Sequence, residues 1–217
     1  MIIVIASEKG GTGKTTISTN LSVLRALNQK KVLLVDSDAQ QSSVDFINVR
    51  NIDNVFPDIT CTPVIESHAN DILLSFKDKF DDIIVDVGGR DSVTMRSVIS
   101  IADVLIVPFL PGSLDAWSTE KMSRLAGECI KSVNNNLRVL CVLNKADVNP
   151  KNKDNEDIIN LVNTYPSLPN ICLALHYRVS YRRAIGEGRG VMEITGKNRD
   201  NKAVCEINKL YDEVFSD

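Results

Sequence analysis

The sequence has few of the features that mark disulfide-rich, membrane-spanning or uniformly basic proteins. Its five cysteines are scattered without a Cys-x-x-Cys pair, and their odd number argues against a disulfide framework. No apolar run approaches the ~20 residues that a membrane-spanning helix needs, and the N-terminal run is too short for a signal segment. The net charge of −3 excludes a uniformly basic nucleic-acid binder. These absences predict a cytoplasmic protein in which any DNA contact comes from a local patch.

The sequence does contain a series of apolar runs, each of which ends in a polar residue or a turn. The 217 residues suit a single domain, 1–217, and the hydrophobic fraction of 43% suits a buried parallel sheet. We therefore expect an α/β fold with a mostly parallel, doubly wound sheet of seven or eight strands and helices on both faces. The strands expected are residues 1–6, 31–36, 59–65, 80–86, 102–108, 137–143 and 170–175.

A glycine-rich loop lies between the first expected strand and a helix expected over 17–27. It departs from the P-loop pattern G-x-x-x-x-G-K-[ST] only at the opening position, where glycine is replaced. Glycines let backbone N–H groups turn toward phosphate oxygens, Lys14 would reach the β/γ-phosphates, and the Thr15 hydroxyl would bind Mg²⁺. The predicted nucleotide-binding residues here are Lys9, Gly10, Gly11, Thr12, Gly13, Lys14, Thr15 and Thr16.

Three motifs give the chain a family resemblance. The loop from Lys9 to Thr15, Lys-Gly-Gly-Thr-Gly-Lys-Thr, resembles the deviant Walker A motif of the ParA/MinD family of P-loop ATPases. The segment from Asp36 to Ser42 resembles the family's Asp-x-Asp-Pro-Gln-x-Ser, with Ala39 in place of proline. Asp86 closes an apolar strand as a Walker B acid does.

The resemblance implies a role for each of these residues. Lys9 would reach across a nucleotide-sandwich dimer to the partner's phosphates, and with Lys14 and Asp38 it forms the predicted catalytic set. Asp38 would orient the attacking water, while Asp36 and Asp86 would hold Mg²⁺ through its water shell. The Gly88 N–H would bond the γ-phosphate only when ATP is present. The alternatives are a solvated loop residue at Lys9, which spacing alone would favour, helix capping by the two acids near 36–38, and a plain turn at Gly88.

The segment Asn144-Lys145-Ala146-Asp147 supports two interpretations. Asn-Lys-x-Asp after a strand is how GTP-binding switch proteins read guanine, whereas in the ParA/MinD family an asparagine here contacts adenine. Both make Asn144 a base contact. Lys9 and the Asp-x-Asp segment favour ATP.

Two further sets of residues are expected at surfaces. Asp115 and Trp117, together with Lys9, are the candidate dimer interface, although ordinary packing explains Trp117 equally well. Four arginines crowd a short stretch and could hold DNA phosphates without reading sequence; a solvated face or pairing across the dimer is the alternative. The arginines are Arg178, Arg182, Arg183 and Arg189.

These features resemble a short ParA partition ATPase that begins at its first strand. The resemblance implies a weak ATPase that uses ATP and Mg²⁺, forms a homodimer with ATP, binds nonspecific DNA and is stimulated by a ParB-type partner. Its function would be to segregate or position DNA, whether a plasmid, a chromosome or a mobile element. It would be cytoplasmic, associated with the nucleoid when ATP-bound, and would not bind membrane, because the last helix lacks basic amphipathic character. The alternatives are a GTPase switch and a metabolic P-loop ligase of the dethiobiotin-synthetase type. A nitrogenase-iron-protein-like reductase is disfavoured because no cysteine lies between Asp86 and Gly127.

Overall fold

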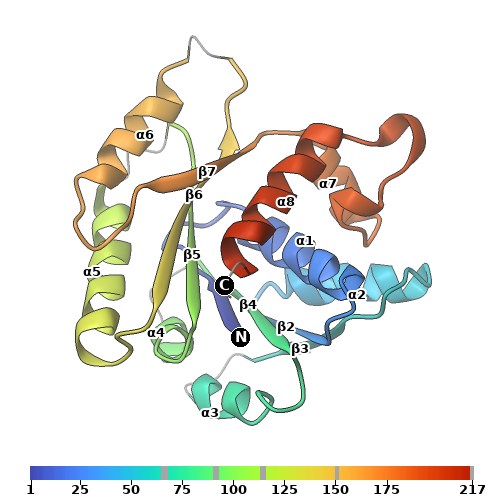
Figure 1. Cartoon of the computed structure of the whole chain (residues 1–217), viewed down its shortest axis with the longest axis horizontal. Coiled ribbons are helices and arrows are strands. Elements are labelled where there is room, and N and C mark those ends of the chain that lie inside the picture. Colours follow the sequence, from blue (N-terminus) through green and yellow to red (C-terminus); the bar gives the residue numbers. More distant parts are fainter. Residues whose placement is uncertain (65–67, 90–92, 113–115, 150–151, 216–217) are drawn as a thin grey trace.

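The computed structural model in Figure 1 describes residues 1–64, 68–89, 93–112, 116–149 and 152–215. Its strands form one seven-stranded sheet in the order β3-β2-β4-β1-β5-β6-β7, and every neighbouring pair is parallel. The expected parallel α/β sheet is therefore confirmed. The strands are β1 Ile2–Ile5, β2 Val32–Ser37, β3 Thr60–Pro63, β4 Asp82–Val87, β5 Val104–Phe109, β6 Arg138–Ala146 and β7 Ile171–His176.

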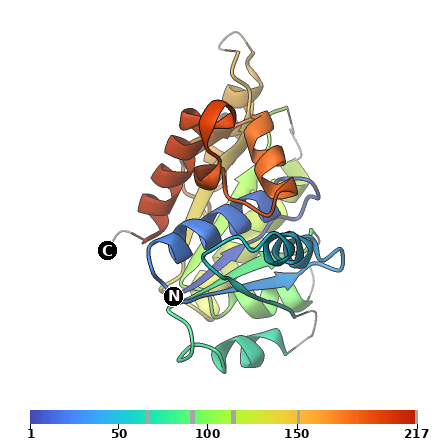
Figure 2. The same cartoon turned by 90° about the vertical axis from the view of Figure 1, so that its right-hand side faces the viewer.

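Helices cover both faces of the sheet because its central strands are apolar on both sides. In β1, Ile2 and Val4 pack into one hydrophobic core, and Ile3 and Ile5 into the other. Helices α3 to α6 contribute to the first core, and α1, α2, α7 and α8 to the second (Figures 1 and 2). Their bounds are α1 Lys14–Leu27, α2 Ser42–Ile52, α3 Ala69–Leu74, α4 Val93–Ile99, α5 Ala116–Ser132, α6 Asp154–Asn163, α7 Val179–Gly186 and α8 Asn201–Phe215, with short 3-10 turns η1 Val191–Glu193 and η2 Gly196–Asn198.

The strand order places the start of the chain at the centre of the sheet. β1 pairs with β4 on one side and β5 on the other, so the strand order reverses beside it. In open parallel sheets ligands collect at the carboxyl ends of the strands at such a reversal. The register also aligns Asp36 of β2 with Asp86 of β4. The loop after β1 and these two acids therefore meet at one edge.

Candidate nucleotide-binding site

The loop between β1 and α1 has the backbone that a phosphate cradle requires. Gly11 and Gly13 have φ values of +74° and +88°, which other residues rarely adopt. A Cβ atom built on Gly10 or Gly11 would meet nothing within 4 Å, so this backbone is open to a ligand. α1 begins directly afterwards at Lys14, and its N-terminal N–H groups favour an anion. The loop can therefore hold phosphate oxygens.

Two side chains at the carboxyl end of β6 donate hydrogen bonds to the backbone of this loop. The Asn144 side-chain amide donates to the Thr12 carbonyl at 2.6 Å, and the Lys145 ammonium donates to the Gly11 carbonyl at 2.7 Å. Asn144 is buried, and a Cβ atom at Gly13 would lie 2.0 Å from its Nδ2. No local pattern in the sequence indicates this supporting role for Asn144 and Lys145.

The Asp86 carboxylate lies beneath the loop and joins two helices. Its Oδ2 accepts hydrogen bonds from the Thr15 hydroxyl of α1 at 2.7 Å and from the Ser43 hydroxyl of α2 at 2.8 Å. Its Oδ1 is buried and has no hydrogen-bond partner among the described residues. A buried carboxylate oxygen of this kind fits a water of a hydrated Mg²⁺, and the Thr15 hydroxyl fits the ion itself. These residues therefore suit the metal that the sequence predicts.

Burial changes the ionisation of the two charged groups in this part of the site. It lowers the pKa of Lys14, although the charges of Asp86 and Asp38 act in the opposite direction. Burial also raises the pKa of Asp86 to about 6, against the hydrogen bonds from Thr15 and Ser43. Both groups are therefore held partly out of water. There Lys14 would interact strongly with a bound anion, and Asp86 with a bound cation.

The two acids after β2 make different contacts. Asp36 caps the first turn of α2, accepting from the N–H groups of Ser43 at 2.7 Å and Val44 at 3.1 Å. Its other oxygen, Oδ1, accepts from the Asp38 N–H at 3.0 Å. Capping thus accounts for the contacts of Oδ2, and the metal role of Asp36 stays a prediction. Asp38 borders the phosphate-side cleft, where its Oδ1 accepts from the Gln40 N–H at 3.0 Å. Its position suits a group that acts on a water near the γ-phosphate.

The segment after β4 closes the same cleft. A Cβ atom on Gly89 would lie 3.2 Å from the Gly10 Cα and 3.3 Å from the Lys14 Nζ. One on Gly88 would lie 3.5 Å from the Asp38 Cα. Glycine at position 89 thus eases the close approach of this backbone to the loop, whereas a side chain at position 88 would make only ordinary contact with Asp38. The cleft has a volume of about 830 Å³ and is lined by Gly10, Gly11, Gly13, Lys14, Thr15, Ser37, Asp38, Ala39, Gln40, Ser42, Gly88, Gly89, Thr94 and Lys145.

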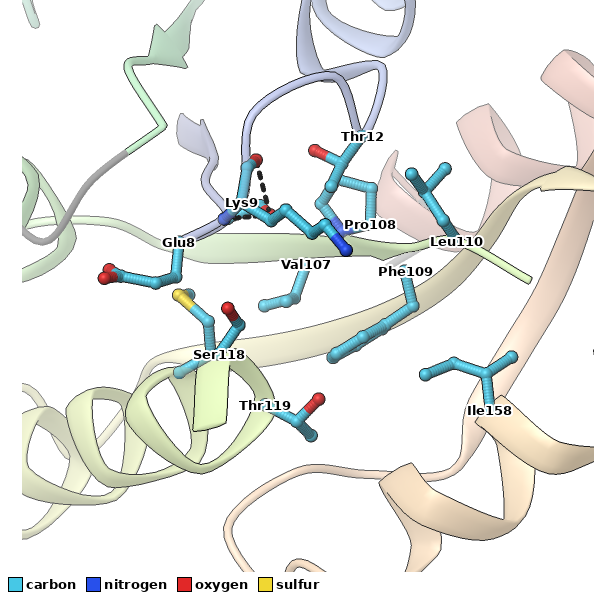
Figure 3. A pocket seen from close by; sticks show the side chains of 12 residues that line it. Glu8, Lys9, Thr12, Val107, Pro108, Phe109, Leu110, Ser118, Thr119 and Ile158 are labelled. Carbon is cyan, nitrogen blue, oxygen red and sulfur yellow. Dashed lines mark hydrogen bonds between the residues drawn. The ribbon is translucent and has the colours of Figure 1, made fainter. Parts of the chain in front are cut away.

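Lys9 lies outside the phosphate-side cleft of its own chain. It is exposed and borders a small pocket at the end of β5, where its side chain extends past Pro108 toward Leu110 (Figure 3). Thr12 borders the same pocket. Nearby, the carboxylate of Glu8 pairs with Lys121 of α5 at 2.7 Å, which fixes the start of the loop. Of the other expected interface residues, Trp117 is 81% exposed, and Asp115 lies outside the described residues.

A second pocket of about 280 Å³ adjoins the loop on the side of β6 and β7. Asn144 lines it, and the base contact expected of Asn144 stays a prediction; we call this cavity the candidate base pocket. Most of its other walls come from β7, α7 and the two residues between them, within the segment 176–193 that the family resemblance places around adenine, and Thr16 of α1 contributes as well. The pocket is lined by Thr16, Asn144, Lys145, His176, Tyr177, Arg178, Val179, Tyr181, Arg182 and Ile185.

One carboxylate on α8 organises the walls of this base pocket. Glu206 accepts from His176 Nδ1 at 2.9 Å, taking that nitrogen as protonated, from the Arg178 guanidinium at 2.6 Å and from the Tyr181 hydroxyl at 3.2 Å. The backbone N–H of His176 donates to it as well, at 3.1 Å. Burial alone would raise the pKa of Glu206, but the bonds from Arg178 and His176 outweigh it and the pKa is lowered. Glu206 is therefore a charged anchor for the pocket.

Asp147 does not face the base pocket. Its carboxylate accepts from the Asn149 N–H at 2.8 Å and from the Asn152 amide at 2.7 Å, in the turn before α6. Asp147 is absent from the lining of that pocket but borders an adjoining one together with Lys145 and Tyr177. Its carboxylate is therefore engaged in a turn beside the base pocket.

The four arginines expected at one surface separate into two groups. Arg178 is engaged by Glu206 and lies 3.9 Å from Asp200, with only 16% of its side chain exposed. Its charge is thus balanced within the chain, so it does not belong with the exposed arginines. Arg182 and Arg183 are exposed on α7, and Arg189 is half-buried just beyond it.

The fold and the cradle together define a P-loop nucleotide-binding protein. Residues 3–191 match the model of the CobQ/CobB/MinD/ParA nucleotide binding domain, so the chain belongs to this ParA/MinD family. No helix in the described ranges is long and apolar enough to cross a membrane.

Similarity to individual proteins extends over the whole chain. The chain is 28% identical to the maintenance of carboxysome distribution protein A of Halothiobacillus neapolitanus, over 98% of this chain and 95% of that protein. Its fold matches the Cyanothece McdA–ATP complex with a TM-score of 0.74 at 18% identity, covering 98% and 95% of the two chains. It also matches the Mg-ADP complex of the septum site-determining protein MinD of Pyrococcus horikoshii, with a TM-score of 0.75 at 20% identity and coverages of 100% and 96%.

Proposed function

We propose that this chain is a ParA-like ATPase switch that pairs with a second copy in its ATP form and then binds DNA nonspecifically, to segregate or position a cargo. The observation that carries the proposal is the contrast between two lysines. Lys14 lines the phosphate-side cleft together with Asp38, whereas Lys9 lies outside that cleft and is exposed. A lysine in this position is suited to contact the phosphates of a nucleotide bound to a second copy of the chain.

ATP and Mg²⁺ are the proposed cofactors. The buried Oδ1 of Asp86 and the Thr15 hydroxyl would hold the ion, which when bound neutralises charge on the phosphates. Lys14 and the loop N–H groups would hold the phosphates, and Asp38 would accept a hydrogen bond from the attacking water and fix its direction. Because catalysis of phosphoryl transfer is mainly positioning and electrostatics, slow turnover is expected until Lys9 of a second copy is added.

The contacts of Asp147 support ATP over GTP. Guanine recognition by an Asn-Lys-x-Asp segment needs the aspartate at the base, and here the Asp147 carboxylate is taken up by Asn149 and Asn152. Asn144 remains at the base pocket. Competition of ATP and GTP for a fluorescent nucleotide checks this choice: ATP should displace the probe at lower concentration, and equal or better displacement by GTP would contradict it.

The DNA-binding and partner roles rest on the family resemblance and on the exposed arginines. Arg182 and Arg183 are proposed to contact DNA phosphates, with Arg189 beside them. Pairing of two copies would join two such surfaces and multiply the counterion release, so DNA affinity would rise steeply. A ParB-type protein is the proposed activator of hydrolysis. The similarity to a carboxysome distribution protein supports a protein body as a second candidate cargo.

A DNA-binding assay tests the proposal against the metabolic-ligase alternative. The wild type should bind a labelled duplex of arbitrary sequence with ATP and Mg²⁺, and only weakly with ADP and Mg²⁺. Asp38→Ala should bind ATP normally, hydrolyse it about 100-fold more slowly and stay on DNA longer. A wild type that hydrolyses ATP but binds DNA equally weakly in both nucleotide states would contradict the proposal and favour a ligase.

A further inference from the structure

The largest fully buried side chain of the described residues carries a charge that the nucleotide site does not use. Arg50 lies near the end of α2, and its side chain is 1% exposed. Its guanidinium donates to both oxygens of Glu193 at 2.8 Å, and to the carbonyls of Gly188 at 3.0 Å and Pro57 at 2.9 Å. A buried charge persists only when paired in this way, so α2 is firmly tied to the segment that contains Gly188 and Glu193.

The segment Gly188–Glu193 is shaped to fit against α2. Gly188 has a φ of +61°, and a Cβ atom there would lie 2.5 Å from the Arg50 backbone nitrogen. Glu193 also accepts from the Gly190 N–H at 2.8 Å, so one carboxylate holds both Arg50 and the turn. The segment therefore cannot shift relative to α2 without breaking a charged, buried network.

The same segment is also tied to α1. The Val191 N–H donates at 2.9 Å to the side chain of Asn20, which is fully buried. Asn20 in turn donates to the Thr16 carbonyl at 2.8 Å, in the first turn of α1. The segment is thus attached to both helices, which lie next to α7 on one face of the sheet (Figures 1 and 2).

Both of these helices begin at the candidate site for phosphate and metal. α1 starts at Lys14, and α2 starts where Ser43 bonds Asp86. A change in the relative position of these two starting points would move the helices as rigid bodies and pull on the segment that joins them. The segment follows α7, which carries Arg182 and Arg183, and it includes Arg189.

We infer that Arg50 and Glu193 are positioning residues that make the placement of Arg182, Arg183 and Arg189 depend on the nucleotide state. The inference rests on the proposed function, since it assigns the residues through which ATP would control DNA affinity. The ion pair fixes the segment to α2, and Asn20 fixes it to α1. The Arg189 N–H donates to the Ala184 carbonyl of α7 at 2.9 Å, so the segment is also joined to the helix that carries Arg182 and Arg183. A coupling of this kind is expected to change affinity about fivefold or more.

The test uses the double variant Arg50→Met, Glu193→Leu, which removes both charges of the pair and leaves no buried charge uncompensated. Its DNA affinity is measured with ATP and with ADP, each with Mg²⁺, at one salt concentration. Fluorescent-nucleotide affinity and sedimentation with ATP are measured on the same samples. We expect normal nucleotide binding and pairing, but a ratio of ATP-state to ADP-state DNA affinity that falls about fivefold, to the value that pairing alone supplies.

A matched control and a milder variant separate the outcomes. Arg25→Met, Asp82→Asn removes a partly buried pair at the other end of α1 and should keep the wild-type ratio. Glu193→Gln keeps the side-chain volume and an acceptor for Arg50 but removes its counter-charge, so urea unfolding first checks that it is folded; the folded variant should have a reduced ratio. An unchanged ratio in Glu193→Gln and in the double variant overturns the inference, as does an equal loss in the control. A wild type whose ratio is already one overturns the proposed function as well.

Discussion

At the scale of single residues, the site depends on close approach and on buried charge. Gly13 lies against Asn144, Gly89 lies against Gly10 and Lys14, and one carboxylate, Glu206, holds the walls of the base pocket. A methyl group at Gly13 would clash with the Asn144 amide, one at Gly89 would crowd Gly10 and Lys14, and the walls of the pocket depend on the charge of Glu206. Single substitutions should therefore have large and specific effects on nucleotide binding.

Gly13→Ala should abolish the cradle. A methyl group would clash with the Asn144 amide, and the φ of +88° is strained for alanine. We expect nucleotide affinity to fall by about 100-fold, which is about 3 kcal/mol. Gly186→Ala is the matched control, because a Cβ atom there meets nothing within 4 Å. Titration with a fluorescent nucleotide measures the affinity of both variants. Near-normal affinity in Gly13→Ala would contradict this account of the loop.

Glu206 gives a prediction for pH. Its pKa is lowered in the folded protein, so its carboxylate binds fewer protons folded than unfolded. Its contribution to stability is therefore present above the unfolded pKa and is lost as pH falls through the folded pKa. Glu206→Gln should flatten the fall of the unfolding free energy below about pH 4.5, the ordinary range of glutamate. Urea unfolding across pH measures this, with exposed Glu128→Gln as control; identical profiles for Glu206→Gln and wild type would contradict it.

At the scale of elements, the loop that begins α1 and the turn that begins α2 form much of the site. Asp36 caps α2 through two N–H groups, and Ser43 of α2 bonds Asp86 of β4. The position of α2 is therefore linked to Asp86, the acid proposed to hold Mg²⁺. This link allows the capping and metal roles of Asp36 to be separated by experiment.

Asp36→Ala should lower the free energy of unfolding by about 1–2 kcal/mol, the usual cost of removing a helix cap. If Asp36 also supports Mg²⁺, the Mg²⁺ concentration for half-maximal ATP hydrolysis should rise. Asp45 is an exposed acid in the first turn of α2, and Asp45→Ala is the control. It should change neither the unfolding free energy nor the Mg²⁺ requirement strongly. A loss of stability with an unchanged Mg²⁺ requirement would leave Asp36 as a cap only.

Elements with strong local patterns were predictable, and features made by distant contacts were not. The strand, glycine loop and helix around Lys14 follow from spacing, and Asp36 and Asp86 were placed by the strand-end rule. α4 was missed because Val93–Ile99 spans only two turns, too short for a helical period. The contacts of Glu206 with Arg178 and of Arg50 with Glu193 are not predictable from the sequence. The two partners are separated by 28 positions in the first pair and by 143 in the second, and no local pattern links residues so far apart. The sequence groups Arg178 with the other three arginines because it shows the charge of Arg178 but not the carboxylate, Glu206, that neutralises it.

At the scale of the whole molecule, the net charge of −3 requires that DNA binding come from one region. Arg182 and Arg183 are exposed on α7, on the face opposite α5. Arg182→Ala and Arg183→Ala should each weaken ATP-state DNA binding. Each should also make the slope of log affinity against log salt shallower by about one unit for every phosphate that is no longer neutralised. Arg124→Ala on α5 is an exposed control. Equal slopes in all three variants and the wild type would place the DNA-binding surface elsewhere.

The central claim is that Lys9 couples the nucleotide state to pairing, and sedimentation of the wild type and Lys9→Ala with ADP or with ATP tests it most directly. Lys9 lies outside its own chain's phosphate-side cleft, so its loss should leave ATP binding to the monomer largely intact. The account predicts a dimer only for the wild type with ATP, and monomers in the other three samples. A Lys9→Ala protein that pairs with ATP and turns over normally would contradict it.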